Sequence, residues 1–258
     1  MDFQRILNAV EPGSLLIVHA SFKPCKAAGL TPAGVIHDLL DRLGPEGTLM
    51  MPTFSYCYEN HPRKAFYDPA NTPGVLNGIL SETFRQTPGV LRSGNPTFSV
   101  AVKGKYEQVL TSGSRDNAGL GHGSSYENAF RLGAKILLLN VRNDHNSMLH
   151  YAEVASGVPY NDIPFRESWG SKAVTIHGDM ELVPAHPACS DSFGKFDNVF
   201  VSQGFAQDLG GSFLIDAQKM VAYICGQIRK QPDIMLCDNP ECEPCVRRRK
   251  RLRDEGLI

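Results

Sequence analysis

Hydrophobic residues along the first fifty positions are spaced like a strand, a helix and a second strand. The apolar run Ser14–His19 (SLLIVH) follows a Pro-Gly turn signal and predicts a buried strand. A helix is expected between Thr31 and Gly44, because threonine suits the N-cap, the proline after it suits the first turn, and glycine suits the end. The run Thr48–Met51 predicts the second strand, so the unit has the length of a parallel crossover.

The middle of the chain continues this alternation of strands and helices. Helices are expected at 76–85, 106–111 and 147–156, and strands at 98–102 and 136–141. The connection 52–74 is long, and such loops are usually functional or disordered. The predicted fold class is α/β, with a central, mostly parallel or mixed sheet flanked by helices.

The last third of the chain has a different pattern. Strands at 173–176 and 181–183 predict a hairpin with its turn at Gly178 or Asp179. An amphipathic helix is expected at 216–229. We expect a single domain over 1–258, in which 173–200 forms the hairpin, as a subdomain or flap, with an adjoining loop. The cysteine-containing tail 233–258 ends in a charged run, 247–253, that predicts a solvated helix.

Composition narrows the class of protein. Hydrophobic residues make up 42% of the 258 positions and charged residues 21%, as in a soluble globular protein. The net charge of −1 gives no reason to expect a nucleic-acid or membrane partner. The first eight residues include Asp2 and Arg5 and lack the apolar stretch of a secretory signal. We therefore expect a cytoplasmic protein whose seven cysteines are mostly reduced.

The segment Asn143–Glu153 (NDHNSMLHYAE) contains the densest group of reactive side chains. It directly follows a predicted buried strand, and open α/β sheets bind ligands at the carboxyl ends of their strands. His150 and Glu153 are three positions apart and share one face of the expected helix. A carboxylate beside an imidazole fixes its tautomer and stabilises the protonated ring, as in a general base with its orienting partner. The alternative is a plain ion pair on an exposed helix.

Two other functions are compatible with this segment. Asp144, His145, His150 and Glu153 are all metal-ligand types, and together they would suit a metal-dependent amidohydrolase. The His-Glu-x-x-His spacing of many zinc hydrolases is missing from the segment. The remaining alternative is a non-catalytic binding protein.

Six segments in a fixed order resemble motifs of one enzyme family. They are His19–Phe22 (HASF), Gly44–Thr53 (GPEGTLMMPT), Phe66–Pro73 (FYDPANTP), Arg92–Pro96 (RSGNP), Gly121–Ser125 (GHGSS) and Asp144–Glu153 (DHNSMLHYAE). With these motifs, the chain resembles the aminoglycoside 3-N-acetyltransferase family from roughly residue 12 to residue 229. The resemblance implies transfer of an acetyl group from acetyl-CoA to an amine. The family's motif histidine falls on His150, its glutamate on Glu153, and the aspartate expected near the acceptor amine on Asp68.

The resemblance also directs attention to ligand-binding residues. Polar and backbone groups expected to contact acetyl-CoA belong to His19, Ala20, Ser21, Phe22, Thr53, Arg92, Ser93 and Gly123. The hydroxyl of Thr53 or Ser21, or a loop N–H, is expected to stabilise the tetrahedral oxyanion. Residues expected on the acceptor side are Asp68, Asp144, Asn146 and Asp191. Without the resemblance, Asp68 is simply a turn residue before proline and the loop 121–125 a flexible glycine-rich connection.

The chain departs from the family pattern in the loop expected on the acceptor side. Antibiotic-modifying members are strongly acidic there, as suits a polycationic acceptor. Between 181 and 197 this chain has three acidic residues, Glu181, Asp191 and Asp197, and a basic Lys195. We therefore expect an acceptor less cationic than a typical aminoglycoside. A second departure is Asn95, which replaces the histidine usual before Pro96.

The cysteines near the end of the chain suggest a structural zinc site. Cys242 and Cys245 form a Cys-x-x-Cys pair, and His186 and Cys189 form a His-x-x-Cys pair. Two such pairs can supply four tetrahedral ligands, with Cys237 competing for the place of His186. The alternative is free thiols or a redox pair in a tail unrelated to catalysis. A pair of exposed flaps would also permit a homodimer.

Overall fold

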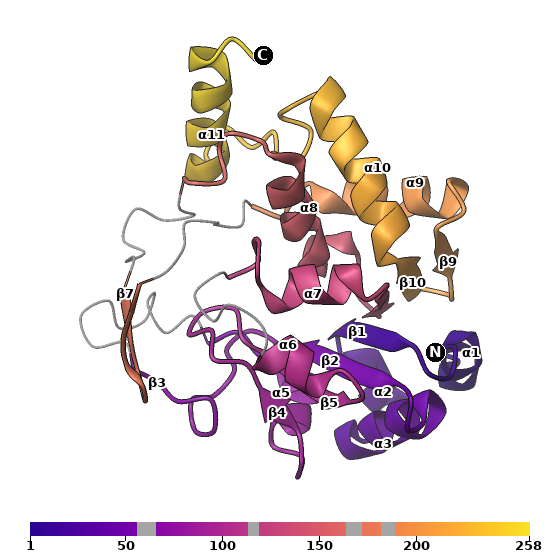
Figure 1. Cartoon of the computed structure of the whole chain (residues 1–258). Helices are drawn as coiled ribbons and strands as arrows, with labels where there is room; N and C mark the ends of the chain where they lie inside the picture. The colour runs from indigo at the N-terminus through magenta and orange to yellow at the C-terminus, as the bar shows by residue number, and fades with distance from the viewer. Residues whose placement is uncertain (56–65, 113–118, 164–171, 182–188) are drawn as a thin grey trace.

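The computed structural model describes residues 1–55, 66–112, 119–163, 172–181 and 189–258 (Figure 1). Its main sheet has seven strands in the order β4-β5-β2-β1-β6-β10-β9. The strands are β4 (Leu91–Arg92), β5 (Val100–Gly104), β2 (Thr48–Pro52), β1 (Leu15–Ala20), β6 (Lys135–Leu139), β10 (Phe213–Asp216) and β9 (Ala206–Asp208). Strand β1 is parallel to both β2 and β6, and the outer pairs are antiparallel. The predicted mixed sheet is confirmed.

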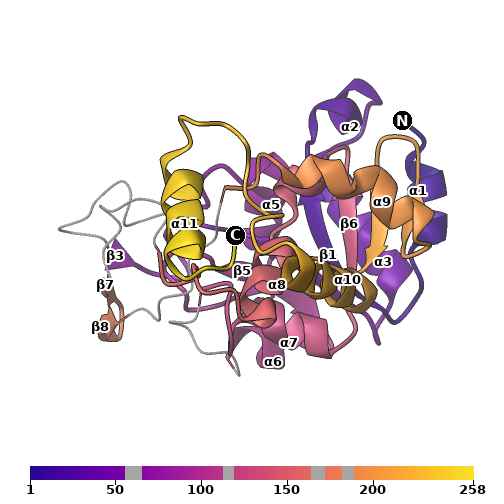
Figure 2. The ribbon, with the colours of Figure 1, turned by 90° about the horizontal axis from the view of Figure 1, so that it is seen from above.

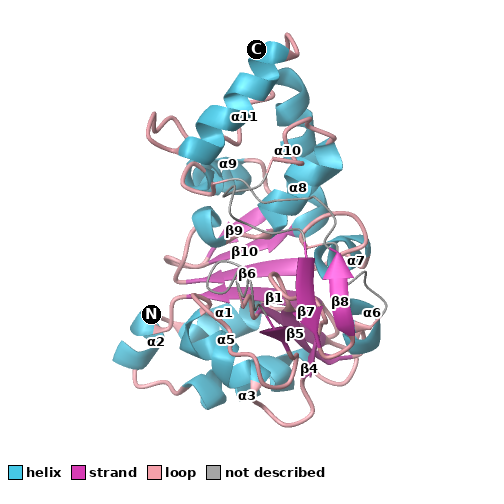
Figure 3. Cartoon of the chain, turned by 90° about the vertical axis from the view of Figure 1, so that its left-hand side faces the viewer, coloured by secondary structure: helices cyan, strands magenta, loops and turns pink. Residues whose placement is uncertain are grey.

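Helices cover both faces of this sheet (Figure 3). On one side lie α1 (Phe3–Ala9), α2 (Lys23–Ala27), α3 (Pro32–Leu43) and α5 (Gly78–Arg85). On the other lie α6 (Glu107–Thr111), α7 (Ser125–Arg131), α8 (Met148–Ser156), α9 (Asp197–Ser202), α10 (Ala217–Lys230) and α11 (Glu243–Asp254). Two 3-10 turns, η1 (Asn143–His145) and η2 (Phe193–Phe196), precede α8 and α9. None of the described helices is long and apolar enough to cross a bilayer.

The central strands are apolar on both faces because each face supports a separate hydrophobic core. In β1, Leu15 and Ile17 belong to the core under α8 and α10, whereas Leu16 and Val18 belong to the core under α3 and α5. Strand β6 alternates in the same way. Successive side chains of a strand point to opposite faces, so the continuous apolar runs of the sequence are what a covered sheet requires.

Helix α3 begins and ends where its sequence signals predict. The Thr31 side chain accepts a hydrogen bond from the Gly34 N–H at 3.1 Å, and Pro32 occupies the first turn. Gly44 then ends the helix with φ of +66°. The cap, the proline and the glycine together explain why both boundaries could be predicted.

The predicted hairpin exists, but its turn lies two residues earlier than expected. Strands β7 (Lys172–Thr175) and β8 (Gly178–Glu181) pair antiparallel around Ile176 and His177. The Thr175 hydroxyl accepts from the His177 N–H at 3.1 Å and donates to the Gly178 carbonyl at 3.0 Å, which stabilises the tighter turn. A strand from far upstream, β3 (Phe66–Tyr67), adds parallel to β7 and was not predicted. That the hairpin acts as a flap stays a prediction.

The prediction for the charged tail was wrong in one respect. Helix α11 begins at Glu243, and one of its faces is buried against the rest of the protein. Cys245, Arg248 and Leu252 are buried, and their spacing places them on one helix face. Within the run 247–253 every residue except Leu252 is basic, so the sequence does not distinguish the buried Arg248 from its more exposed neighbours.

His19, near the end of β1, is a buried imidazole. It is 5% exposed, and its Nε2 has no hydrogen-bond partner among the described residues. Burial, and secondarily electrostatic repulsion from His145, lowers the pKa of His19 to about 3. The ring is therefore neutral in the folded protein throughout the ordinary pH range.

This shift predicts a loss of stability in acid. The unfolded chain binds a proton at His19 below pH 6.5 and the folded chain does not, so stability is full above that pH and falls below it. From pH 7.5 to pH 5, His19 should cost about 2 kcal/mol of unfolding free energy. Urea titrations of wild type and His19→Asn at both pH values measure this difference. Equal pH dependence in the two proteins would contradict it, and His37→Asn, on an exposed surface, is the control.

Gly104 at the end of β5 predicts a sharp difference between two alanine substitutions. Its φ is +127°, and a Cβ there would lie 2.2 Å from the Gly47 carbonyl oxygen and 2.8 Å from the Thr48 Cα. Gly133 also has positive φ, but no atom lies within 4 Å of its added Cβ. Gly133→Ala should lower the melting temperature by only about 2–4 °C, whereas Gly104→Ala should lower it by about 10 °C or more because backbone must move. Similar melting temperatures for the two variants would refute this account.

Candidate active site

The three parallel strands β2, β1 and β6 are neighbours, so the segments that follow them gather at one edge of the sheet. The Ser21 N–H after β1 donates to the Leu139 carbonyl at the end of β6 at 2.9 Å. Asn140, with a left-handed φ of +56°, turns the chain there and donates from Nδ2 to the Ser21 carbonyl at 3.4 Å. Open α/β sheets bind ligands at this edge, and the position of the site here stays a prediction.

His150 and Glu153 form a buried hydrogen-bonded pair on α8. The distance from His150 Nδ1 to Glu153 Oε2 is 2.8 Å. His150 is 9% exposed and Glu153 only 1%. The prediction that the two side chains share a helix face is confirmed, and the alternative of an exposed surface pair is wrong.

The second oxygen of Glu153 is held by a residue that the sequence did not reveal. The Tyr160 hydroxyl donates to Glu153 Oε1 at 2.9 Å. Burial, and then the charge of Glu153, raises the pKa of Tyr160 well above its usual value, so the phenol stays protonated. An ionised carboxylate only accepts hydrogen bonds, so beside it His150 donates from Nδ1, and a neutral imidazole in that tautomer has its lone pair on Nε2.

An aromatic ring lies against the imidazole. The ring centroids of Phe193, in η2, and His150 are 4.9 Å apart with a tilt of 52°. Phe193 is fully buried and lies in the region that the sequence presents only as a polar loop. Neither Phe193 nor Tyr160 has a motif around it, so only the fold could identify them as neighbours of the pair.

The turn that leads into α8 is fixed by a buried carboxylate. Asp197 Oδ1 accepts from the Asn143 backbone N–H at 3.1 Å and from its Nδ2 at 2.7 Å, and Arg142 Nε donates to Oδ2. Asn146 Oδ1 accepts from the Met148 N–H at 3.2 Å at the start of the helix. The buried Asn146 side chain therefore has a structural hydrogen bond at the start of α8, whereas the nearby Asp144 stays partly exposed beside His145.

Arg92 connects the loop after β2 to the loop that begins at Asp68. It donates from Nε to the Thr53 hydroxyl at 3.1 Å, and from Nη1 to the Thr72 carbonyl. The Thr53 hydroxyl in turn donates to the Ser99 carbonyl at 3.2 Å. These bonds within the protein are enough to hold the side chains of Arg92 and Thr53 in place. Contacts of the two residues with acetyl-CoA stay predictions.

The other predicted ligand residues occupy turns and strand ends. Asp68 accepts from the Ala70 N–H at 2.9 Å and from Asn71 Nδ2 at 2.6 Å, and the Asn71 bond is the main cause of its lowered pKa. The Ser93 hydroxyl accepts from the Val100 N–H at 3.0 Å. The Gly123 N–H donates to Glu127 Oε2 at 2.5 Å. Ala20 and Phe22 flank Ser21, and Asp191 is exposed.

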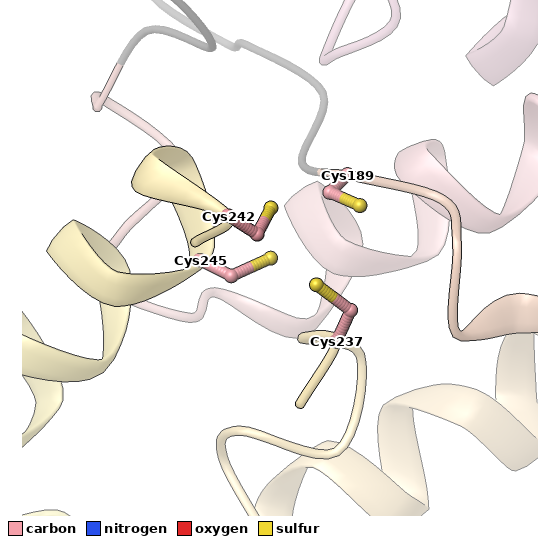
Figure 4. Close-up of side chains that lie close together, drawn as sticks. All are labelled: Cys189, Cys237, Cys242 and Cys245. Atoms are coloured by element: carbon pink, nitrogen blue, oxygen red, sulfur yellow. The ribbon is translucent and has the colours of Figure 1, made fainter. Parts of the chain in front are cut away.

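The four cysteines of the C-terminal region meet in space, as Figure 4 shows. The sulfur atoms of Cys189, Cys237, Cys242 and Cys245 all lie within 4.8 Å of one another. The structure thus brings Cys237 into the group, while His186 lies outside the described residues. Hydrogen bonding from the Cys189 thiol, the largest cause, lowers the pKa of Cys245 to about 5. Among the described residues, Asp144, His145, His150 and Glu153 form no comparable ligand group.

The chain is similar to proteins of one known family. The family described as "Aminoglycoside 3-N-acetyltransferase" matches residues 17–226. Aminoglycoside N(3)-acetyltransferase IV of a Salmonella species is 31% identical over 242 residues, which cover 90% of this chain and 87% of that protein.

Solved structures agree with the sequence comparison. The apoenzyme of aminoglycoside acetyltransferase AAC(3)-IVa superposes with a TM-score of 0.80 at 28% identity, covering 96% of this chain and 94% of that one. A histidine-to-alanine mutant of the same enzyme, in complex with a gentamicin, gives 0.79 at 28% identity over 95% and 93%. AAC-IIIb, solved with CoASH, shares the fold with a TM-score of 0.68 at 24% identity over 86% and 92%. The chain therefore belongs to the aminoglycoside 3-N-acetyltransferase family and is an acyltransferase.

Proposed function

We propose that the protein transfers the acetyl group of acetyl-CoA to an amine of a small-molecule acceptor, with His150 as the general base and Glu153 as its orienting partner. The observation that carries this proposal is the hydrogen bond of 2.8 Å between His150 Nδ1 and Glu153 Oε2, at a helix that follows a central parallel strand. The family's activity supplies the reaction class, and this pair supplies the proton acceptor that an attacking amine requires.

The reaction needs one proton transfer at each stage. As the amine nitrogen bonds to the thioester carbonyl carbon, its proton passes to His150 Nε2, and Glu153 stabilises the imidazolium that forms. The tetrahedral intermediate then breaks its carbon–sulfur bond, and the proton on His150 passes to the departing thiolate of CoA. Tyr160 keeps Glu153 in one orientation throughout, because its bond of 2.9 Å occupies the other carboxylate oxygen.

The oxyanion of that intermediate requires a hydrogen-bond donor. The Thr53 hydroxyl is buried and donates to the Ser99 carbonyl. The Ser21 hydroxyl has no hydrogen bond among the described residues, and Ser21 directly follows β1 at the carboxyl edge of the sheet. Of the two hydroxyls considered from the sequence, Ser21 is therefore the better donor.

The other functions considered from the sequence lack support of this kind. A metal-dependent amidohydrolase needs a ligand group around 144–153, and in the described residues only the four cysteines form such a group. A buried charge is costly, so a carboxylate such as Glu153, buried with a hydrogen bond to each oxygen, needs a purpose. A non-catalytic binding protein would have no use for such a carboxylate beside an imidazole.

The proposed base predicts a specific loss of turnover. His150→Ala should reduce kcat by about 10²-fold or more, because general-base catalysis contributes that much. Acetyl-CoA affinity, measured by calorimetry, should change little, and release of the CoA thiol with gentamicin as first acceptor reports turnover. His37→Ala is the matched control on an exposed helix surface. Turnover within about threefold of wild type would exclude His150 as the base, and a matching loss of thermal stability would reduce it to a structural residue.

We further propose that the acceptor is less cationic than a typical aminoglycoside. Of the three acidic residues in 181–197, Asp197 is 2% exposed and already bound by Arg142 and Asn143. Asp191 is exposed, whereas the side chain of Glu181 lies outside the described part of the chain. A loop with so little free negative charge adds little attraction for a polycation.

This charge deficit predicts the order of a substrate panel. Amino sugars and aminocyclitols with one or two amines should show kcat/KM about tenfold or more above that of gentamicin, since a tenfold difference needs only about 1.4 kcal/mol. Thiol release at low and moderate salt measures the series. Efficient acetylation of a range of aminoglycosides would disprove the proposal on the acceptor while leaving acetyl transfer itself intact.

A further inference from the structure

The four-cysteine cluster has the dimensions of a metal site. Four sulfur atoms around zinc, each about 2.3 Å from it, would be separated by about 3.8 Å in a regular tetrahedron. The sulfur atoms of Cys189, Cys237, Cys242 and Cys245 all lie within 4.8 Å of one another, and each cysteine is a free thiol. Figure 4 shows the four side chains directed toward a common centre from three separate parts of the chain.

The segments that carry these cysteines are also held by hydrogen bonds around them. Arg249 of α11 donates to the Cys237 carbonyl at 2.5 Å and to the Leu236 carbonyl at 3.3 Å. Ser192, close to Cys189, donates from its hydroxyl to the Met235 carbonyl at 2.9 Å. Outer bonds of this kind orient the ligands of metal sites, so the cluster has a supporting shell as well as four ligands.

Burial and ligand type favour one role for such a site. Cys189 and Cys237 are 5% exposed, Cys245 is 0% exposed, and Cys242 is the partly exposed member. A tetrahedral set of four thiolates selects zinc or iron among the common metals. With all four positions supplied by protein, no position is left for a substrate, which is the pattern of a structural site.

We propose that Cys189, Cys237, Cys242 and Cys245 bind one zinc ion that anchors α11 beside the catalytic helix α8. The ligand set differs from the one that the sequence favoured, since Cys237 takes the fourth place in preference to His186. The metal site itself does not depend on the proposed function, whereas its effect on turnover does.

The anchored segments reach His150 directly and Glu153 through Tyr160. Cys189 lies four residues before Phe193, whose ring centroid is 4.9 Å from that of His150. Cys245 lies three residues before Arg248, whose guanidinium carbon is 5.5 Å from the ring centroid of Tyr160. Tyr160 holds Glu153, and Arg248 Nη2 also donates to the Ile163 carbonyl at 2.7 Å. Zinc would therefore fix the outer supports of His150 and of Glu153 together.

Metal analysis of the full-length protein tests the site directly. Wild type expressed with added zinc should contain about one zinc per chain, because structural sites hold the ion tightly. Cys245→Ser and Cys237→Ser should lose it, whereas His186→Ala and Cys225→Ser should keep it; Cys225 is a buried thiol of α10 outside the cluster. A zinc content under about 0.2 equivalents in wild type would overturn the site. Full zinc content in Cys237→Ser would overturn the ligand set, and visible absorption from bound iron would overturn the choice of metal.

Removal of the metal tests the anchoring, even if the serine variants fail to fold. Treating wild type with a chelator should lower the melting temperature by about 10 °C or more and expose the arginines of α11 to trypsin. Turnover should fall about tenfold or more and return when zinc is restored, as expected for a lost outer support of an active site. Unchanged trypsin resistance and turnover in demonstrably zinc-free protein would overturn the anchoring. A wild type that binds zinc but acetylates no amine would count against the proposed function alone.

Discussion

A buried carboxylate sets the arrangement of one half of the molecule. Glu153 is 1% exposed, and a charge removed from water is tolerated only where hydrogen bonds replace the lost hydration. His150 from its own helix and Tyr160 from the following loop supply those bonds. The aromatic ring of Tyr160 is in turn covered by Arg248 of α11. The need to satisfy one carboxylate thus connects helix α8 to the end of the chain, and Figure 2 shows α11 close beside that region.

The position of the pair depends equally on the central sheet. The parallel strands β2, β1 and β6 bring three loops together, although these loops are distant in sequence. Asp197 then fixes the turn before α8 from a different part of the chain, through Arg142 and Asn143. The turn before α8 and the Glu153 side chain are therefore both held by contacts from outside the helix, which favours a preorganised arrangement.

Local signals explain which elements could be predicted. Helix α3 was found from its cap and its glycine, and β1 and β6 from their apolar runs, because each signal lies within the element itself. Strands β9 and β10 were missed, since their pairing at the sheet edge depends on distant partners. Strand β3 was missed for the same reason. The hairpin was found but shifted, because the Thr175 hydroxyl selects a turn that the glycine alone does not indicate.

The candidate site divides in the same way. His150 and Glu153 share one helix, so their spacing alone predicted their contact. Tyr160 and Phe193 contact the pair from separate segments and Arg248 covers Tyr160, and no spacing rule connects these residues to the pair. Arg92 illustrates the opposite case: its motif marked it for a ligand, but the structure also gives it carbonyl partners within the chain, which a sequence cannot show.

The central place of β1 has a consequence for how the chain reaches this structure. Leu16 of β1 pairs with Lys135 of β6, so one side of the strand has no partner until more than half of the polypeptide has been synthesised. Such distant pairing costs loop-closure entropy before it brings any stability, and it slows folding. During translation, one edge of β1 therefore stays unpaired until β6 has been synthesised. The sheet therefore cannot close around its central strand until β6 is available, whatever the intrinsic propensities of the first strands and helices.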